Sequence, residues 1–319
     1  MRPKLSVVIP TFNSKAYVVE CVASALNQTY SNIEVIVDDN TSKDGTPETL
    51  EKVFGSDPRF KLFKNDEDLN IPKGWNRGMF RATGEYVLLL HSDNLLHPQY
   101  AEALSQLSEK LSPEVIYTES LYFENETPKG LFADLDLKSQ VPLTYLTPGA
   151  RAVDYIFRYQ RMIPTSCVAV HRSCFEGRAP FDHRFLWDPD IELMTWLGTH
   201  FSVAHINHSL AAIRTHAGQA ASWKDPTFTD QYRGLLEYAN QAGNSGYHQF
   251  LLHWSWSNQD ICEKLAQIRA VPFKAYWKYQ WKWFKAECEL FGHFFRHFGR
   301  KMKMMARFLQ TSISTRLHA

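Results

Sequence analysis

The sequence lacks the features of disulfide-rich secreted proteins, zinc-knuckle proteins and proteins with membrane-spanning helices. Five of its 319 residues are cysteines, and none forms a C-x-x-C pair, which argues against a disulfide framework and a zinc knuckle. No apolar run approaches the roughly 18 residues that a membrane-spanning helix needs. The short apolar run at 7–9 ends at Pro10, so we expect a first strand there and no signal peptide. These absences favour a cytoplasmic protein with reduced thiols.

Several motifs of common α/β enzymes are also missing. Neither G-x-G nor G-x-x-x-x-G-K-[ST] occurs, so the dinucleotide fingerprint and the P-loop are both absent. H-E-x-x-H and G-x-S-x-G do not occur either, which argues against a zinc protease and an α/β-hydrolase. A phosphorylated ligand would have to be held without a glycine-rich loop.

Composition and charge suit a large folded core with two unlike regions. With 44% apolar and 22% charged residues, the chain is not a disordered protein. The net charge of +1 hides an asymmetry, because residues 271–319 contain ten basic and two acidic residues. The two regions therefore face different partners.

Short β-rich runs alternate with helical patterns along the first part of the chain. Predicted strands are 5–9, 33–37, 60–63, 86–90, 115–123, 166–171, 201–204 and 210–214. Predicted helices lie near 16–26, 46–53, 72–81, 98–107 and 190–197. This alternation predicts a mostly parallel sheet covered by helices, with ligands beyond the carboxyl ends of its strands. We expect one domain at 1–222 and a helical extension at 223–319.

Acidic residues follow two of the predicted strands. Asp39 begins a run of turn-forming residues before a helix, so a structural role is as plausible as ligand binding. Asp93 follows the nearly continuous apolar strand 86–90, which predicts a buried central strand. A carboxylate delivered to the sheet edge in this way is a natural ligand for Mg²⁺ or Mn²⁺.

A series of motifs occurs in a characteristic order. They are VVIPTFN at 7–13, VDDNTSKDGT at 37–46, WNRG at 75–78, GEY at 84–86, HSDN at 91–94, then Phe181-Asp182, Asp190-Ile191-Glu192-Leu193 and Arg214-Thr215-His216. This series closely resembles the nucleotide-sugar-binding domain of glycosyltransferase family 2, over about the first two thirds of the chain. The resemblance implies a GT-A fold, which is α/β and Rossmann-like, with a mixed, mostly parallel sheet flanked by helices.

The resemblance also implies a site for the sugar donor. The donor-binding residues that it implies are Pro10, Thr11, Phe12, Asp39, Asn76, Ser92 and Asp93. Among these, Pro10 to Phe12 would line the nucleoside pocket. Asp39 would accept a hydrogen bond from the base, with uracil or thymine favoured.

The resemblance further implies catalytic and metal-binding residues. Asp93 matches the last acid of the family's D-x-D motif and would hold a divalent cation, Mn²⁺ or Mg²⁺, that bridges the diphosphate. His216 would approach the diphosphate or this metal. Asp190 matches the general base, and Asp188 is close enough in sequence to rival it. The implied reaction moves one sugar, with inversion, from a nucleoside-diphosphate sugar to a hydroxyl of a glycan or lipid-linked acceptor, as in surface polysaccharide assembly.

Three positions depart from the family pattern. His91 replaces the first acid of D-x-D, Pro189 replaces the acid before the base, and Trp75 stands where an arginine is common. His91 leaves the metal preference open and favours one alternative, a degenerate, non-catalytic subunit that binds nucleotide sugar or serves assembly. The other alternative is a nucleotidyltransferase, which the missing glycine-rich loop disfavours.

The segment 273–309 carries an aromatic stripe at helical spacing. Basic residues beside this stripe are Lys278, Lys282, Lys285, Arg296 and Lys303. The pattern predicts an amphipathic helix on an anionic membrane surface, which would place the protein on the inner face of the plasma membrane. Docking of the stripe on the catalytic domain or on a second copy is the alternative, and nucleic-acid binding is not expected. The sequence carries no motif for the sugar, the acceptor or the oligomeric state.

Overall fold

The computed structural model describes residues 2–133, 143–149, 152, 164–183 and 189–217. All of them lie within one compact unit, Met1–Ala220. The predicted extension 223–319, including the segment 273–309, lies outside the described residues. Within the described part, no helix is both long and apolar enough to cross a lipid bilayer.

Strands and helices alternate as the sequence pattern predicts. In chain order the elements are β1 (Leu5–Thr11), α1 (Val18–Leu26), β2 (Ile33–Asp39), α2 (Thr46–Phe54), β3 (Phe60–Lys64), α3 (Ile71–Phe80), β4 (Tyr86–Leu89), β5 (Leu95–Leu96), α4 (Tyr100–Leu111), β6 (Val115–Glu124), β7 (Leu143–Leu146), β8 (Val168–His171), α6 (Pro189–His200) and β9 (Val203–Thr215). Two short 3₁₀ helices, η1 (Thr165–Cys167) and η2 (Arg172–Phe175), flank β8.

The strands form one mixed sheet in the order β3-β2-β1-β4-β8-β6-β9-β5, with β7 paired to β9. The pairs β1–β2, β2–β3, β1–β4 and β6–β9 are parallel, whereas β8, β5 and β7 run antiparallel to their neighbours. Because these three strands run against all the others, the sheet is mixed and mostly parallel in direction. The predicted sheet is confirmed.

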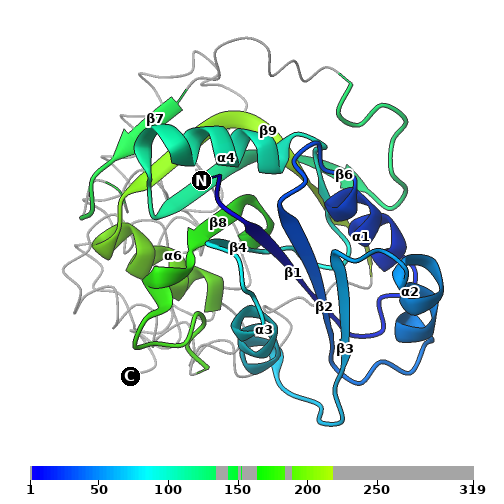
Figure 1. The fold of residues 1–319 in the computed structure, drawn as a ribbon. Helices are drawn as coiled ribbons and strands as arrows, with labels where there is room; N and C mark the ends of the chain where they lie inside the picture. The colour runs from blue at the N-terminus through cyan, green and yellow to red at the C-terminus, as the bar shows by residue number, and fades with distance from the viewer. Residues whose placement is uncertain (1, 134–142, 150–151, 153–163, 184–188, 218–319) are drawn as a thin grey trace, which may run out of the picture. The chain divides into compact units, whose positions relative to one another are not determined.

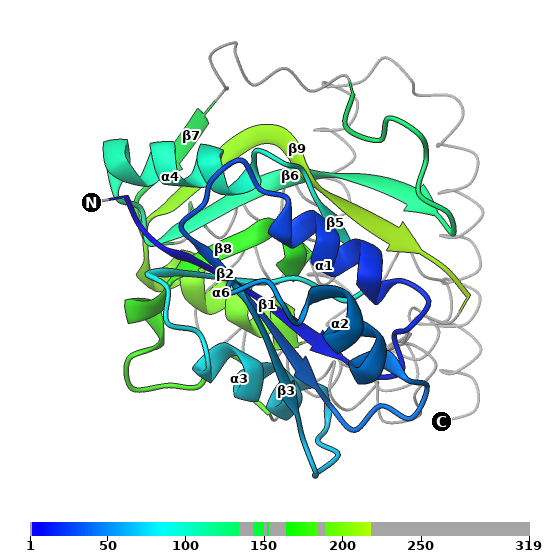
Figure 2. The same cartoon turned by 45° about the vertical axis from the view of Figure 1, so that its right-hand side comes forward.

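The strand order reverses at β1, which has β2 on one side and β4 on the other. Right-handed crossovers then place α1 and α2 on one face of the sheet and α3 on the other, as Figures 1 and 2 show. Such a reversal opens a crevice beyond the carboxyl ends of the strands, where ligands of open α/β sheets bind. The loops after β1, β2 and β4 therefore meet at one edge.

The central strands are covered on both faces, which explains their almost unbroken apolar character. Val7, Val8 and Ile9 of β1 are completely buried, as are all four residues of β4 to within a few per cent. This rigid centre supports the loops at the carboxyl edge.

Two strand predictions are wrong in detail. In place of the ranges 201–204 and 210–214 the structure has one long strand, β9, which begins at Val203. The polar residues between the two predicted ranges continue this strand through an irregularity where the register against β6 shifts. The predicted strand 166–171 begins with the turn η1 and becomes a strand at Val168. The short strands β5 and β7 carry no clear alternation and were missed.

A buried carboxylate on β2 is held by several donors. Glu34, 2% exposed, accepts hydrogen bonds from Lys61 Nζ (2.7 Å), Ser6 Oγ (2.5 Å) and the backbone N–H of Thr83 (2.7 Å). Burial alone would raise the pKa of Glu34, but these hydrogen bonds outweigh it and hold the pKa well below the usual range. The ionised carboxylate therefore stabilises the fold.

We expect Glu34→Gln to lower the free energy of unfolding by about 2 kcal/mol at pH 7, because the donors lose a charged acceptor. Because the pKa of Glu34 is lower in the folded protein than in the unfolded chain, the ionised carboxylate adds stability above about pH 4.3, the pKa of an unfolded glutamate. This stability is lost as the pH falls below that value. The difference in the free energy of unfolding between the wild type and the variant, measured by urea titration, should therefore become smaller below about pH 4. Glu51→Gln, which removes an exposed ion pair with Lys64, is the control and should cost less than about 1 kcal/mol. A constant gap from pH 7 to pH 3 would contradict the prediction.

Candidate functional site

The carboxyl edge of the sheet gathers most of the predicted site residues. β1 ends at Thr11, β2 ends at Asp39, and the loop 91–94 follows β4. Asp39 lies directly beside Thr11 in the β1–β2 register, so two of the predicted donor residues are neighbours.

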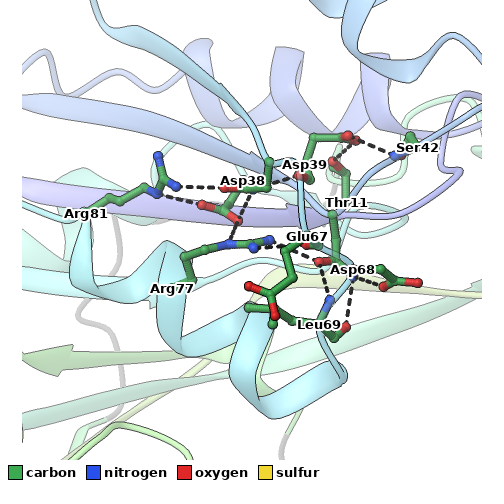
Figure 3. Close-up of polar contacts among 11 residues, drawn as sticks. Thr11, Asp38, Asp39, Ser42, Glu67, Asp68, Leu69, Arg77 and Arg81 are labelled. Atoms are coloured by element: carbon green, nitrogen blue, oxygen red, sulfur yellow. Dashed lines mark hydrogen bonds and ion pairs between the residues drawn. The ribbon is translucent and has the colours of Figure 1, made fainter.

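Asp39, the predicted base-binding residue, has both of its carboxylate oxygens hydrogen-bonded within the protein. Its carboxylate, on a residue 2% exposed, accepts hydrogen bonds from Thr11 Oγ1 (2.9 Å) and from the backbone N–H of Ser42 (2.9 Å), as Figure 3 shows. One bond falls on each oxygen, and a carboxylate oxygen has a further lone pair. Nearby on the loop after β1, the Phe12 ring is 54% exposed, as an aromatic platform for a flat ligand would be.

The loops after β1 and β2 are joined by side chains. The Asn13 backbone N–H donates to Ser42 Oγ (2.8 Å), and Asn13 Oδ1 accepts from the Lys43 N–H (2.8 Å). Asn13 and Thr41 adopt left-handed backbone conformations, with φ of 50° and 65°. Such conformations are costly for residues other than glycine and persist where surrounding contacts hold them, often at functional sites.

A second buried carboxylate, Asp38, was not predicted as a site residue. Arg77 Nε donates to its Oδ1 (2.9 Å), Arg81 Nε lies 2.7 Å from its Oδ2, and Asn65 Nδ2 donates at 2.8 Å. Arg77 and Arg81 lie one turn apart at the end of α3, so this ion-pair cluster ties α3 to the end of β2. The i, i+4 arginine pair and a second acid beside Asp39 at the end of an apolar strand were the available signals.

Asn40 extends this network to the loop 65–70. Asn40 Nδ2 donates to Asp68 Oδ1 (2.8 Å) and to the Leu69 carbonyl (2.9 Å), while Asn40 Oδ1 accepts from the Leu69 N–H (3.0 Å). Arg77 Nη2 donates to the same Oδ1 at 3.0 Å. The network therefore ties the loop 65–70 to the end of β2, and Figure 3 shows Asp68, Leu69 and Arg77 of this network near Asp38 and Asp39.

Asp93 and His216 come together from distant parts of the sequence. His216 Nε2 lies 3.2 Å from Asp93 Oδ2, and the two side chains are 13% and 18% exposed. The described residues contain no group of three or more His, Cys, Asp or Glu that could hold a metal. A hard cation held by this pair would complete its shell with water and phosphate oxygens, as Mg²⁺ commonly does. The two predicted metal ligands thus fit such an ion.

His91, in the place of the first acid of D-x-D, is built into the protein. Its Nε2 lies 2.8 Å from Thr165 Oγ1, its backbone N–H donates to Ser166 Oγ (3.1 Å), and its ring packs on Trp75 with centroids 5.0 Å apart. Burial lowers the pKa of His91, and the charge of Asp93 opposes this only in part. A neutral imidazole that joins β4 to η1 has a structural role.

Ser92 and Asn76 also bond to the protein. Ser92 Oγ donates to Ser14 Oγ (2.8 Å) across the loops after β4 and β1. The Asn76 amide is buried and holds the backbone of Phe181, accepting from its N–H (2.8 Å) and donating to its carbonyl (2.7 Å). This amide therefore anchors the segment that leads to α6, and its donor-binding role stays a prediction.

Asp190 lies in the first turn of α6 and is half-buried. Its rival Asp188 lies outside the described residues. Two residues further along α6, the buried Glu192 accepts hydrogen bonds from both terminal nitrogens of Arg178 (2.9 and 3.2 Å). Such a bidentate pair fixes the start of the helix that carries Asp190.

The substitution His91→Asp restores the first acid of the family's D-x-D motif. We expect it to lower the free energy of unfolding by about 3 kcal/mol at pH 7. The new carboxylate would be half-buried near Asp93 without a cationic partner of its own. The loss should shrink as the pH falls towards 4 and the carboxyl group binds a proton.

His91→Asn is the matched control, because it keeps a hydrogen-bonding group without the charge. His91→Asn should lower the free energy of unfolding by about half as much as His91→Asp. Thermal and urea unfolding of both variants measures this difference. Equal stability of the two, with tighter Mn²⁺ binding by the aspartate variant, would show instead that position 91 faces the cation.

Comparison with known proteins agrees with this geometry. The family model described as Glycosyl transferase family 2 matches residues 6–176. The putative glycosyltransferase EpsH of Bacillus subtilis is 26% identical over 183 residues, which cover 57% of this chain and 53% of EpsH. A Campylobacter jejuni protein named GalNAc(5)-diNAcBac-PP-undecaprenol beta-1,3-glucosyltransferase is 37% identical over 109 residues, 34% of each chain. The chain thus spans about a third to a half of these relatives.

Solved structures show the same fold. TarS of S. aureus, in complex with UDP-GlcNAc, has a TM-score of 0.59 at 17% identity, covering 84% of this chain and 82% of TarS. The mannosyltransferase PcManGT from Pyrobaculum calidifontis, in complex with GDP-Man and Mn²⁺, has a TM-score of 0.54 at 17% identity, covering 99% and 88%. At such identities the likeness concerns the fold alone. The family match covers more than half of the chain, and the chain belongs to glycosyltransferase family 2.

Proposed function

We propose that the chain is an inverting glycosyltransferase that moves one sugar from a nucleoside-diphosphate donor to a hydroxyl group. The observation that carries this proposal is the pairing of Asp93 with His216 at the same sheet edge as Asp39. A base-binding carboxylate and a cation-binding pair at one strand-order reversal match the two ends of a nucleoside diphosphate.

UDP and dTDP sugars are the favoured donors. A uracil or thymine ring N–H can donate to the carboxylate of Asp39, and the exposed ring of Phe12 offers a stacking surface. The presence of UDP-GlcNAc in TarS supports a nucleotide sugar of this kind.

Asp93 and His216 would hold a divalent cation, Mn²⁺ or Mg²⁺. When bound, such an ion supplies Lewis-acid stabilisation of the charge on the departing diphosphate. The carboxylate and the imidazole make a mixed oxygen and nitrogen site, which suits Mn²⁺ at least as well as Mg²⁺.

Asp190 would act as the general base. It takes the proton of the acceptor hydroxyl while the oxygen forms a bond to the anomeric carbon. The bond from that carbon to the diphosphate oxygen breaks, and the nucleoside diphosphate leaves with the electron pair. A single in-line displacement inverts the anomeric configuration and needs no covalent nucleophile. A positioned base of this kind contributes about 10²–10⁴ in rate.

A glycan or a lipid-linked sugar is the proposed acceptor. The Campylobacter jejuni relative is named for an undecaprenol-linked acceptor, and other relatives are named chondroitin synthases. A non-catalytic binding subunit is the second candidate, because His91 leaves one carboxylate fewer at the cation site.

A donor panel separates these two candidates. The full chain is incubated with UDP-, dTDP- and GDP-sugars plus Mn²⁺ or Mg²⁺, and release of nucleoside diphosphate is followed with and without glycan or lipid-linked acceptors. Cation-dependent release that an acceptor accelerates supports the transferase. Donor binding without release under any of these conditions would support the binding subunit.

We expect Asp190→Asn to lower kcat by about 10²–10⁴ while donor affinity stays unchanged, because only the proton acceptor is removed. Asp93→Asn should have a different signature, with loss of the Mn²⁺-dependent part of donor binding. Calorimetric titration of donor with and without Mn²⁺, together with rate measurements, distinguishes the two variants. Full turnover by the Asp190 variant would move the base to another residue, with Asp188 tested next.

The segment 273–309, which lies outside the described residues, is proposed to bind an anionic membrane at the cytoplasmic face. Each basic residue near such a surface contributes about 1 kcal/mol. Replacing Lys278, Lys282 and Lys285 together by Gln should therefore weaken partitioning to phosphatidylserine vesicles by about a hundredfold. Vesicles of neutral phosphatidylcholine are the control. Unchanged sedimentation with anionic vesicles would contradict membrane attachment.

A further inference from the structure

Arg214 is a buried arginine that lies next to the Asp93–His216 pair. It lies near the end of β9 and is 1% exposed. Arginine is almost never fully buried unless its charge is paired and its N–H groups are hydrogen-bonded. Its surroundings therefore show what the charge is used for.

The guanidinium group joins three segments. Its Nε donates to the Asp93 carbonyl (2.9 Å), its Nη1 donates to the Asn125 carbonyl, and its Nη2 donates to Glu20 Oε2 (2.7 Å) and Thr127 Oγ1 (3.2 Å). It therefore links the loop after β4 to α1 and to the chain after β6.

Both candidate metal ligands are attached to this one residue. The Arg214 backbone N–H donates to Asn94 Oδ1 (3.0 Å), so the loop of Asp93 is held at two points. His216 follows Arg214 by two residues. The ring of Tyr17 lies 4.6 Å from the Arg214 guanidinium carbon and 4.6 Å from the His216 ring centroid.

We propose that Arg214 is a positioning residue that sets the separation of Asp93 and His216 and thereby the affinity of the site for its divalent cation. The inference rests on the proposed cation site. It concerns a residue that would not touch the ion, because its guanidinium donors point to the Asp93 carbonyl and away to Asn125 and Glu20.

Charge and shape explain why an arginine can serve here. A bare cation behind the site would repel a divalent ion, but the Glu20 carboxylate at 2.7 Å compensates its charge. The planar, rigid fork of the guanidinium directs several donors at fixed angles, which the single ammonium of lysine cannot reproduce. Residues that orient metal ligands from behind typically change metal affinity by about 10–100-fold when mutated.

The test uses the full chain with Mn²⁺ and UDP, GDP or dTDP as probes. Electron paramagnetic resonance of Mn²⁺ measures free and bound ion, and calorimetry measures nucleotide binding with and without Mn²⁺. For Arg214→Lys we expect Mn²⁺ affinity in the presence of nucleotide to fall about 10–100-fold. Binding of the nucleotide without metal should stay the same, because Asp39 and Phe12 are untouched.

Two further variants separate positioning from general destabilisation. Glu114→Gln weakens a part-buried contact to Ser202 at the opposite end of β6 and is the stability control, with Mn²⁺ affinity unchanged. Glu20→Gln keeps Arg214 in place but removes its charge partner, and Glu20 has an exposed side chain. This change should weaken Mn²⁺ binding by at most about fivefold.

The outcomes distinguish this inference from the proposed function. Unchanged Mn²⁺ affinity in Arg214→Lys, or an equal loss in Glu114→Gln, would overturn the positioning role and leave the cation site intact. Failure of the wild type to bind Mn²⁺ with any of the three nucleotides would overturn the cation site, and the positioning role with it. A selective loss in Arg214→Lys supports both.

Discussion

Charged groups that leave water at the carboxyl edge of a parallel sheet must find partners within the protein, and this constraint organises the site. Asp38 is held by two arginines and an asparagine, Asp39 by a hydroxyl and a backbone amide, and Arg214 by carbonyls and Glu20. For each of these three residues, the partners come from at least two different segments of the chain. Satisfying the buried charges therefore fixes the loops relative to one another before any ligand arrives.

The proposed site divides into a nucleoside half and a cation half, which are supported in different ways. The nucleoside half is held by the loops after β1 and β2 and by the Asn40 clamp on the loop 65–70, so it is built from local α/β units. The cation half joins Asp93 to His216, which comes from the far end of β9, so it depends on long-range contacts. The proposed binding of the base and the proposed binding of a metal-bridged diphosphate can therefore be perturbed separately by mutation, which is useful for assigning function.

His91 shows how a departure from a family motif is absorbed by the fold. The family resemblance leads one to expect a carboxylate there, but the structure places a neutral imidazole between Thr165 and Trp75. Trp75 also packs on Phe181, at 5.1 Å between centroids, and Phe181 is held by Asn76. His91 and Trp75, which replace a family acid and a common arginine, thus pack in one group with Phe181, and this group ties β4 to the segment before α6.

The sequence alone determined the order of the β/α units, the buried central strands and the acids that end them, because apolar periodicity and burial are local consequences of the residues. The strand-end residues Thr11, Asp39 and Asp93 followed from that pattern and from the family motifs. The family resemblance placed Asp93 and His216 at one metal site, but their direct contact, the arginine cluster around Asp38 and the contacts of Arg214 were decided only by the tertiary structure. These hydrogen bonds join residues from 27 to 194 positions apart, so they depend on strand order and register. The continuous strand β9, which ends just before His216, was itself not apparent from the apolar pattern.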